Sequence, residues 1–395
     1  MTKEKVIPQI RFSGFTDTWE QRKLGEVVKE VTRNDPTSEA PIMMITANNG
    51  FIEQSERYAF NNAGESLKKY ILLEKGELAY NHGASKLRPY GSCFALTTAE
   101  NARIPFVYHC FSAENQNAEF MSIELNGSEI ENQLRKIVSS GARMDGLLNI
   151  SFDEYSSVSV VLPNIEEQNR IADFFRHLDR LITLHQRKYD KLTKVKKAML
   201  EKMFPENGSS YPEIRFKGFT DAWEQHKLGE FADIVGGGTP STSNFEYWDG
   251  DIDWYAPAEI ADQIFVSSSE RKITQQGYDN SSAKMLPVGT VLFTSRAGIG
   301  KTAILRKEGC TNQGFQSIVP HINELDSYFI FSRSEEMKRY GETVGAGSTF
   351  VEVSGKQMAN MELMMPTTME EQVTIGSFFR NLDSIITLHQ RKPFC

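Results

Sequence analysis

Apolar and bulky residues recur in alternating steps of three and four between Glu166 and Phe204, which is the spacing of one face of a long helix. Pro163 lies just before this stretch and Pro205 just after it, and both favour helix ends. At about 1.5 Å per residue, the helix would span roughly 58 Å. Its apolar seam consists of Ile171, Phe175, Leu178, Ile182, His185, Tyr189, Leu192, Met199 and Met203.

A second helix with the same seam is predicted in residues 370–392. A helix with one apolar stripe needs a partner, so we expect the two helices to pack as an antiparallel pair. The second helix is shorter, because Pro393 stops it where the first continues. Whether this shorter partner leaves the seam after Tyr189 uncovered is an open question, and the sequence also leaves open whether the shortening is natural. The second seam consists of Ile375, Phe379, Leu382, Ile386 and His389.

Two border segments of the chain are repeated at an offset of 204 residues. Residues 8–26 return at 212–230 with fifteen of nineteen positions identical, and residues 166–188 return at 370–392 with sixteen of twenty-three identical. The inserts between these borders resemble each other far less. Repeated borders around divergent inserts favour two similar modules that contact different targets in one fixed geometry. The alternative is an old duplication whose middle drifted, although drift alone does not spare short border segments.

Each insert predicts a mixed α/β domain, because short β-rich runs are separated by Gly, Asn and Pro. A helix near residues 127–140 is expected to close the first domain. The fold class is therefore α/β, with two mixed domains separated by long helices that pair as an antiparallel coiled coil, in a pseudo-twofold repeat. The predicted segments are a first domain at 1–162, a central helix at 163–207, a second domain at 208–365 and a truncated distal helix at 366–395.

Composition indicates an ordinary soluble chain of two or three domains, with 39% apolar residues. No run of eighteen apolar residues occurs and the first residues are charged, so we expect a cytoplasmic protein. We expect Trp19 and Trp223, which are equivalent in the repeat, to pack in cores. The four cysteines are far apart, which favours buried thiols over disulfides or a zinc site; they are Cys93, Cys110, Cys310 and Cys395.

The formal net charge of −8 argues against nucleic-acid binding through bulk electrostatics. Only residues 166–204 are basic, with ten Lys and Arg against six Asp and Glu. Any DNA binding must therefore come from local clusters or from the help of a partner. The acidic balance keeps open an alternative function, a protein-interaction scaffold without sequence-selective DNA binding.

Several motifs resemble those of the specificity subunit of type I restriction-modification enzymes. They include GFTDAWEQHKLGE in the second border, and the first domain carries looser counterparts in KGELAYNHGASKLRPYG and SGARMDGLLNISFDEY. The resemblance covers nearly the whole chain except the missing part of the distal helix. The most specific motifs are GGGTPSTSNFEYWDGDIDWYAPAEI, TSRAGIGKTAIL, TNQGFQSIVP and the two helices with the pattern EEQ…FF…LD…I…HQRK.

The resemblance implies that each domain is a target recognition domain that contacts one half of a split site in double-stranded DNA. It implies that the helices set the half-site spacing and dock two methyltransferase subunits. The chain itself would be non-catalytic and hold no cofactor; S-adenosylmethionine would belong to the methyltransferase partner, and ATP and Mg to the restriction subunits. A site of about 13 base pairs spans roughly 45 Å, which is comparable with the predicted helix length.

The residues themselves also argue against catalysis. SRAGIGKT at 295–302 resembles a phosphate-binding P-loop, but Ser295 replaces its first glycine and no helical pattern follows Lys301. A nucleotide hydrolase is therefore the weaker alternative to a turn that approaches phosphates. NDPT at 34–37 lacks the second proline and the aromatic residue of an adenine methyltransferase loop. No HExxH motif or His/Cys cluster occurs.

Base reading favours long polar side chains on loops, because Arg and Lys match guanine edges and Asn and Gln match adenine edges. The candidate DNA contacts are Asn81, His82, Ser85, Lys86, Arg88 and Arg143 in the first domain, and Thr239, Ser241, Asn244, Arg296, Lys301, Gln313, Ser348 and Thr349 in the second. The HQRK sequences recur in both helices, so we expect them at the helix pair or at a docking face. These candidate partner contacts are His185, Gln186, Arg187, Lys188, His389, Gln390 and Arg391.

Overall fold

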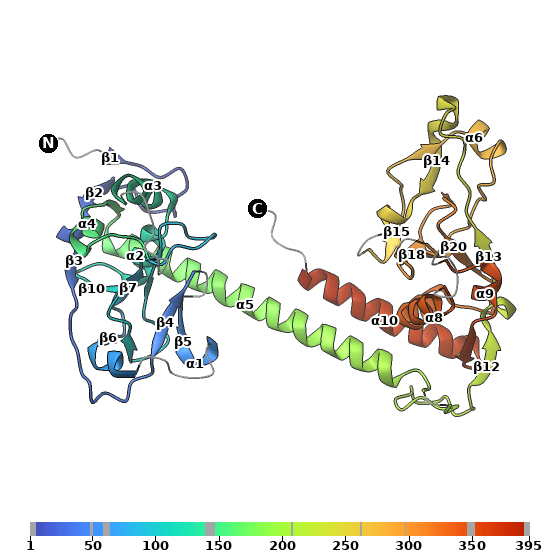
Figure 1. Ribbon diagram of the computed structural model, residues 1–395, viewed down its shortest axis with the longest axis horizontal. Helices are drawn as coiled ribbons and strands as arrows, with labels where there is room; N and C mark the ends of the chain where they lie inside the picture. Colours follow the sequence, from blue (N-terminus) through green and yellow to red (C-terminus); the bar gives the residue numbers. More distant parts are fainter. Residues whose placement is uncertain are drawn as a thin grey trace. The chain divides into compact units, whose positions relative to one another are not determined.

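The computed structural model describes residues 5–47, 50–57, 64–138, 147–206, 208–260, 263–296, 298–345 and 352–390. The chain divides into two compact units, Met1–Ile182 and Thr183–Cys395, and each has its own hydrophobic cores. One continuous helix, α5 (Ile165–Lys202), begins in the N-terminal unit and ends in the C-terminal unit (Figure 1). The predicted helix between Pro163 and Pro205 is therefore confirmed.

The N-terminal unit contains strands β1 (Lys5–Val6), β2 (Trp19–Lys23), β3 (Val28–Glu30), β4 (Met43–Thr46), β5 (Gly50–Glu53), β6 (Ile71–Glu74), β7 (Leu78–Asn81), β8 (Ser92–Ala95), β9 (Asn101–Ile104), β10 (His109–Ala113) and β11 (Ser159–Leu162), and helices α1 (Gln54–Arg57), α2 (Ala118–Leu125), α3 (Ser128–Ile137) and α4 (Phe152–Ser156). Its central sheet is antiparallel in the order β3-β10-β7-β8. Leu78 and Phe111 from this sheet pack with Phe120 of α2 and Leu134 of α3 in one core. Helix α3 confirms the helix predicted near residues 127–140.

The C-terminal unit contains strands β12 (Glu224–Lys227), β13 (Ala232–Gly236), β14 (Trp248–Tyr255), β15 (Phe265–Val266), β16 (Lys272–Ile273), β17 (Val291–Phe293), β18 (Thr302–Leu305), β19 (Cys310–Thr311), β20 (Gln316–Pro320) and β21 (Glu362–Met365), and helices α6 (Gln275–Asp279), α7 (Ser327–Ser332), α8 (Ser334–Gly345), α9 (Gly355–Ala359) and α10 (Met369–Gln390). Its central sheet has the order β13-β20-β17-β18-β15. All of its pairings are antiparallel except β15 with β18.

The two central sheets share one strand order. β3-β10-β7-β8 in the first unit corresponds to β13-β20-β17-β18 in the second, although the insert sequences differ. The predicted α/β class with two mixed domains is therefore confirmed. Burial of thiols is confirmed for the three cysteines in the described part of the chain, and burial raises the pKa of Cys93 to about 12. Trp223 is buried, and Trp19 packs against the core of the N-terminal unit, as predicted.

The two repeated border segments of each unit contact each other, which explains why both segments are repeated at the same offset. Arg11 donates to both carboxylate oxygens of Glu167 at 2.7 Å, and Arg215 does the same to Glu371 at 2.7 and 2.8 Å. Each of these residues lies 204 positions from its counterpart. Because loss of one partner leaves a buried charge unpaired, a change of the Arg or the Glu alone is expected to destabilise the unit.

A second repeated contact ties each long helix to the domain of its own unit. The side-chain oxygen of Gln168 accepts from the backbone N–H of Asn117 at 3.0 Å, and Gln372 accepts from Asp326 at 3.1 Å. Asn117 and Asp326 are the residues that cap α2 and α7. The first turn of each long helix is thus fixed to the start of a domain helix, and both buried glutamines are satisfied.

The antiparallel helix pair is confirmed within the C-terminal unit (Figure 1). Phe204, just beyond the end of α5, contacts Phe379 in the middle of α10, with ring centroids 6.0 Å apart. His185, earlier in α5, contacts His389 in the last turn of α10. Residue numbers therefore fall along α5 as they rise along α10, which is the antiparallel direction.

The end of the seam after Tyr189 is covered in the structure. Met199 and Met203 pack in the main core of the C-terminal unit, because the antiparallel direction places α10 beside the end of α5. The exposed part of the seam lies earlier, before the His185 contact. Its exposed apolar residues are Phe175, Leu178 and Ile182.

Asp253 on β14 is a buried carboxylate whose charge stabilises the C-terminal unit. Burial alone would raise its pKa, but hydrogen bonds from Lys307, Ser269 and Lys272 outweigh burial and lower the pKa to about 2. The folded pKa is thus below the unfolded value near 3.8, so this stability is present above about pH 4 and is lost as pH falls towards 2. The shift is worth about 2 kcal/mol.

We expect Asp253→Asn to lower the free energy of unfolding by about 2 kcal/mol at pH 7 and to flatten its decline below pH 4. Urea unfolding between pH 7 and pH 2.5 measures both effects. Asp251→Asn, an exposed position on the same strand, is the matched control and should behave like the unsubstituted chain. An unchanged pH profile in Asp253→Asn would contradict the assignment.

Candidate functional site

Three loops of the C-terminal unit meet beside the ends of β13, β17 and β20. The backbone N–H of Gly238 donates to Thr311 O at 2.9 Å, and that of Ser295 donates to Gly314 O at 2.7 Å. The Thr239 hydroxyl donates to Gln313 Oε1. The structure thus brings together the loops that carry three sequence-predicted residues. These residues are Thr239, Gln313 and Arg296, which follows Ser295.

Gly237 is a position that only glycine fits. A Cβ atom there would lie 1.9 Å from Asn312 O and 2.4 Å from Thr311 O, well inside van der Waals contact. The absent side chain lets residues 236–239 approach the loop after β19. The sequence run of three glycines before Thr239 was the available signal, and its role is to position Thr239 beside Gln313.

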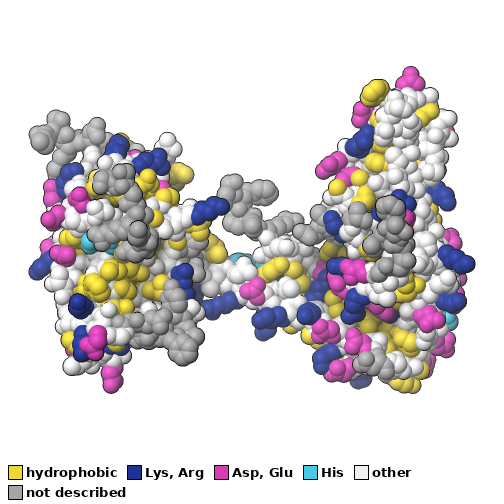
Figure 2. Space-filling view, viewed as in Figure 1, with side chains coloured by type: hydrophobic (Ala, Val, Ile, Leu, Met, Phe, Trp, Pro, Cys, Tyr) yellow, Lys and Arg dark blue, Asp and Glu magenta, His cyan; other side chains and the backbone are white. Residues whose placement is uncertain are grey.

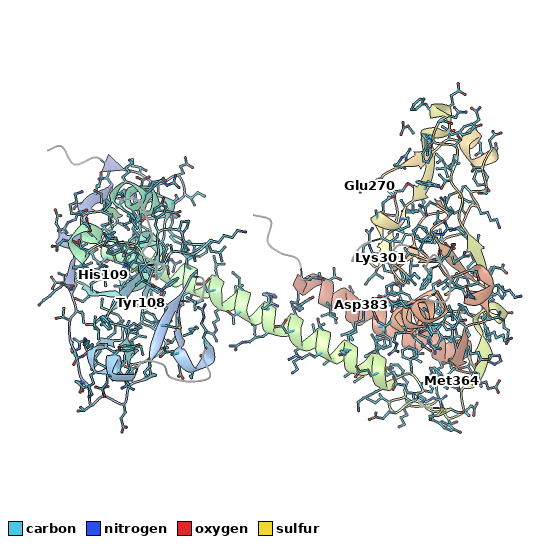
Figure 3. All side chains as sticks on the ribbon, in the orientation of Figure 1. Tyr108, His109, Glu270, Lys301, Met364 and Asp383 are labelled. Carbon is cyan, nitrogen blue, oxygen red and sulfur yellow. The ribbon has the colours of Figure 1, made fainter. Side chains whose placement is uncertain are left out.

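The described residues between β17 and β18, 294–296 and 298–301, form a tight turn. The Thr294 hydroxyl donates to Gly298 O at 2.7 Å and accepts from Lys301 N–H at 3.0 Å. Gly298 and Gly300 have φ values of +103° and +93°, which side chains rarely adopt. Lys301 is exposed at the end of this turn (Figure 3).

A strand, β18, follows Lys301 where a P-loop would start a helix. The segment therefore lacks the helix N-terminus that binds nucleotide phosphates in P-loop proteins. The interpretation as a turn that carries cations fits the geometry better.

Arg296 lies on the same turn and is held by an ion pair. Its Nε lies 2.7 Å from Glu352 Oε1, and both side chains are partly exposed. A nucleic-acid phosphate or base at Arg296 would have to share the guanidinium with this carboxylate. Arg296 is therefore positioned, whereas Lys301 extends into solvent.

The other second-domain candidates lie along the loop that follows Thr239. The Ser241 and Ser243 hydroxyls are 2.8 Å apart. Asn244 caps a short 3-10 helix, because its side-chain oxygen accepts a hydrogen bond from the backbone N–H of Glu246. The side-chain oxygen of Asn244 is therefore engaged locally. Ser348 and Thr349 lie outside the described residues.

In the N-terminal unit, the turn between β7 and β8 occupies the position of the β17–β18 turn. The Ser85 hydroxyl accepts from the N–H of Arg88, and the Arg88 guanidinium donates to Asn126 O at 2.8 Å. Lys86 is exposed between them. The structure thus places Ser85, Lys86 and Arg88 on one turn, and Arg143 lies outside the described residues.

Asn81 and His82 point into the unit instead of towards solvent. The two ring nitrogens of His82 lie 2.7 Å from the carbonyl oxygens of Leu148 and Val107, and the residue is buried. The Asn81 amide donates to Ile45 O at 3.1 Å. Both side chains hold neighbouring chain segments together, which sequence alone did not distinguish from surface contacts. We therefore drop them as candidate base contacts.

The histidines of the two HQRK sequences meet at the helix pair. The Nδ1 atoms of His185 and His389 are 2.9 Å apart, and burial, Lys188 and His185 lower the pKa of His389. Arg187 and Lys188 are exposed, and Lys and Arg side chains gather along this part of α5 (Figure 2). Gln186 donates to Asp190 at 2.9 Å, Gln390 is exposed, and Arg391 lies outside the described residues.

Within the described ranges, no group of three or more His, Cys, Asp or Glu side chains could hold a metal ion. Among the helices of the described residues, none is both long and apolar enough to cross a membrane. The residues that sequence reasoning missed are the positioning ones, above all the Arg–Glu and Gln contacts. Their signal was the shared offset of 204 residues.

A family model, curated proteins and a solved structure that resemble this chain all carry the same description, a specificity subunit or domain of type I restriction-modification systems. The family model described as "Type I restriction modification DNA specificity domain" matches residues 16–194 and 220–393. The MjaIX specificity subunit of Methanocaldococcus jannaschii is 36% identical over 165 residues, which are 40% of this chain and 38% of that protein. The HindI specificity subunit of Haemophilus influenzae is 20% identical over 422 residues, covering 88% of this chain and 90% of that protein. A crystal structure of the S subunit from M. genitalium shares the fold, with a TM-score of 0.59, 11% identity and coverage of 98% and 94%.

Proposed function

Because the chain belongs to the type I restriction-modification DNA specificity family, we propose that each unit reads one half of a split site in double-stranded DNA. The observation that carries this proposal is the shared sheet order of the two units, with different polar side chains on the equivalent turns. One turn presents Lys86 and Arg88, and the other presents Arg296 and Lys301. A common scaffold with different contacts is what two different half-sites require.

The proposed DNA surface of the second unit consists of the three loops that meet around Gln313. Gln313 is a base-reading candidate, because its exposed amide can match an adenine edge. Lys301 and Arg296 are proposed as phosphate contacts that position the loops. In the first unit, Ser85, Lys86 and Arg88 would act in the same way.

The long helices are proposed to set the half-site spacing and to dock two methyltransferase subunits. α5 has 38 residues and is therefore about 57 Å long. The exposed cations Arg187, Lys188 and Lys191 would meet an acidic partner surface or the DNA between the half-sites. The proposed segments remain 1–162, 163–207, 208–365 and 366–395.

The chain is proposed to be non-catalytic. Methylation would then occur in the methyltransferase partner with S-adenosylmethionine, and cleavage in restriction subunits with ATP and Mg. The turn geometry after Lys301 supports this assignment, because it removes the one motif that resembled a nucleotide site.

Exchange of residues 27–162 for the equivalent insert of another family member is the test of the function. The methylated sequence should change in one half-site only, because the second unit keeps its own loops. Methylation mapping of DNA modified by the reconstituted complex measures the outcome. A change in both half-sites would contradict the proposal that each unit reads its half-site independently. DNA that stays unmethylated in the presence of a folded complex would contradict the proposed function itself.

Lys301→Ala is expected to weaken duplex binding about equally for all sequences. The slope of the logarithm of the binding constant against the logarithm of the salt concentration is expected to become less steep by about 0.9. A phosphate contact releases counterions without reading sequence, which explains both effects. Binding is measured by a salt titration of the complex with the methyltransferase. Lys217→Ala, an exposed lysine outside the loops, is the control.

An unchanged salt slope in Lys301→Ala would remove Lys301 from the interface. Absence of sequence-selective binding in the unsubstituted complex would instead favour the interaction scaffold, which the net charge of −8 keeps as the second candidate. The two results are distinguishable, because the second does not depend on the substitution.

A further inference from the structure

A hollow of about 650 Å³ lies in the C-terminal unit between α10, α7 and the ends of β15 and β18. Its described lining carries three cations and one carboxylate, and the carboxylate, Asp383, is already bound. Lys196 forms an ion pair of 2.5 Å with Asp383, and the Tyr328 hydroxyl donates to Asp383 at 2.9 Å. The charges of the described lining that remain are the guanidiniums of Arg306 and Arg380.

The two guanidiniums lie beside one aromatic ring. The Cζ atom of Arg306 is 4.0 Å from the centroid of the Phe265 ring, and that of Arg380 is 5.7 Å from it. Both arginines are exposed, and within the described residues neither forms an ion pair with a carboxylate. A guanidinium that stacks on a ring keeps its N–H donors in its own plane. Both arginines therefore retain donors for an anion.

The carboxylate of Asp326, which lies within electrostatic range of Arg380, is engaged with the backbone. It accepts hydrogen bonds from the N–H groups of Tyr328 at 2.9 Å and Phe329 at 2.7 Å, as the cap of α7. Burial raises the pKa of Asp326, and these hydrogen bonds and the charge of Arg380 oppose the rise. Asp326 thus has its own donors and forms no ion pair with Arg380 in the described part of the chain.

The N-terminal unit contains a counterpart of this hollow in which the equivalent arginine is neutralised. A space of about 700 Å³ lies between α5, α2 and β8, and its lining includes Arg176, which lies 204 positions before Arg380. Arg176 forms ion pairs of 2.9 Å with Glu119 and 2.5 Å with Asp173. The charged residues of the described lining are two cations and two carboxylates, Arg88, Arg176, Glu119 and Asp179.

Both carboxylates that hold the first arginine are replaced by uncharged residues in the second unit. Asp173 corresponds to Ser377 at the offset of the repeat. Glu119 is the second residue after the cap of α2, and the second residue after the cap of α7 is Tyr328. The second hollow therefore keeps the arginine without these two counter-charges, and Arg306 adds a further cation. This difference indicates an anion site in the second unit only.

We propose that Arg306 and Arg380 together bind one phosphate of the DNA backbone, as a contact of the C-terminal unit outside its three loops. The inference rests on the proposed function, because the anion that a DNA-reading unit meets is the phosphate backbone. The fork of N–H donors on arginine matches a phosphate group. The site also supplies a local cationic cluster, which a chain with a net charge of −8 needs for DNA binding.

Strand β18 links this site to the loops of the proposed DNA surface. It begins after Lys301, a proposed phosphate contact, and ends before Arg306. At about 3.3 Å per residue, the Cα atoms of Lys301 and Arg306 are at most about 17 Å apart. This distance corresponds to about five base pairs at 3.4 Å per pair. One DNA half-site is therefore long enough to reach both contacts.

The double variant Arg306→Ala with Arg380→Ala tests the site in a salt titration of the complex with the methyltransferase. We expect the logarithm of the binding constant to depend less steeply on the logarithm of the salt concentration, by about 0.9, the value for one phosphate. Binding should weaken about equally for all sequences, because a phosphate contact reads no base. Arg306→Lys with Arg380→Lys should keep the slope, since both charges remain.

Arg176→Ala in the N-terminal unit is the matched control. Its side chain is 56% exposed and is paired with two carboxylates, so its loss should leave the salt slope unchanged. A decrease as large as that of the double variant would contradict the difference between the two hollows. Circular dichroism verifies that each variant folds, which is expected because Arg306 and Arg380 are exposed.

A set of duplexes with one neutral methylphosphonate linkage each locates the phosphate. One linkage in the half-site of the C-terminal unit should weaken binding of the unsubstituted complex. The same linkage should weaken the double variant no further, because the contact is already lost, whereas losses at independent contacts add. Additive losses at every linkage would contradict a phosphate contact at these two arginines.

An unchanged salt slope in the double variant would overturn the inference. Loss of the methyltransferase from the complex of the double variant would assign the arginines to a protein interface and would overturn it as well. Saturable binding of pyrophosphate at this site, without any change in DNA binding, would assign it to a small phosphate compound and would have the same consequence. Sequence-selective binding by the unsubstituted complex does not depend on these results. Failure of this inference is therefore distinguishable from failure of the proposed function.

Discussion

Arg215→Ala is expected to lower the free energy of unfolding of the C-terminal unit by about 3–5 kcal/mol, because it leaves a buried carboxylate without its cation. The Glu371 side chain is only 2% exposed and accepts two hydrogen bonds from Arg215. The remaining donor, Trp223 Nε1, lies 3.3 Å away and is neutral. Guanidinium chloride unfolding followed by circular dichroism measures the loss.

The double variant Arg215→Met with Glu371→Leu separates the charge from the packing. Replacement of both partners by apolar groups removes the uncompensated charge, so most of the stability should return. Lys217→Ala, an exposed neighbour, should change stability by less than about 0.5 kcal/mol. A double variant as unstable as Arg215→Ala would show that packing, rather than charge, is responsible. The repeat predicts that Arg11→Ala acts in the same way on the N-terminal unit through Glu167.

Phe204→Ala is expected to cost the C-terminal unit about 3–5 kcal/mol, as large-to-small substitutions of buried aromatic residues do. Phe204 contacts three buried aromatic rings and lies on the boundary between the long helix and the core. Its loss would leave a cavity beside Phe379 and release the end of α5.

Phe175→Ala removes an exposed ring of the same residue type in the N-terminal unit and should cost about 1 kcal/mol or less, because the ring is 42% exposed. Differential scanning calorimetry of the two variants measures the contrast, provided that the transitions of the two units are assigned with the Arg215→Ala and Arg11→Ala variants. Equal losses at both positions would contradict the difference in burial between Phe204 and Phe175.

The long helix and its partner could be predicted from sequence because their signals are local and periodic. The steps of three and four between Ile171 and Met203, with Pro163 and Pro205 at the ends, fix the element whatever surrounds it. The sequence did not show which part of the seam stays exposed, because this depends on which end of α10 meets His185. That contact joins residues 204 positions apart and leaves no local pattern.

The candidate loops show the same division. Glycines beside Thr239 and Lys301 indicated close approaches and tight turns, and the structure contains both. The sequence could not show that His82 faces inward, because a histidine on a strand end looks the same whether its ring meets water or the carbonyls of Leu148 and Val107. Strand order was also beyond prediction, since it depends on pairings such as β7 with β10 between distant segments.

Each insert leaves and re-enters its border through a single pair of neighbouring strands. Lys23 on β2 pairs with Ser159 on β11, and Lys227 on β12 pairs with Glu362 on β21, so both ends of an insert lie side by side. A foreign insert needs only to match two adjacent chain ends. Genetic recombination within the near-identical borders could therefore exchange whole inserts, or move one from the first position to the second, without rebuilding the rest of the molecule.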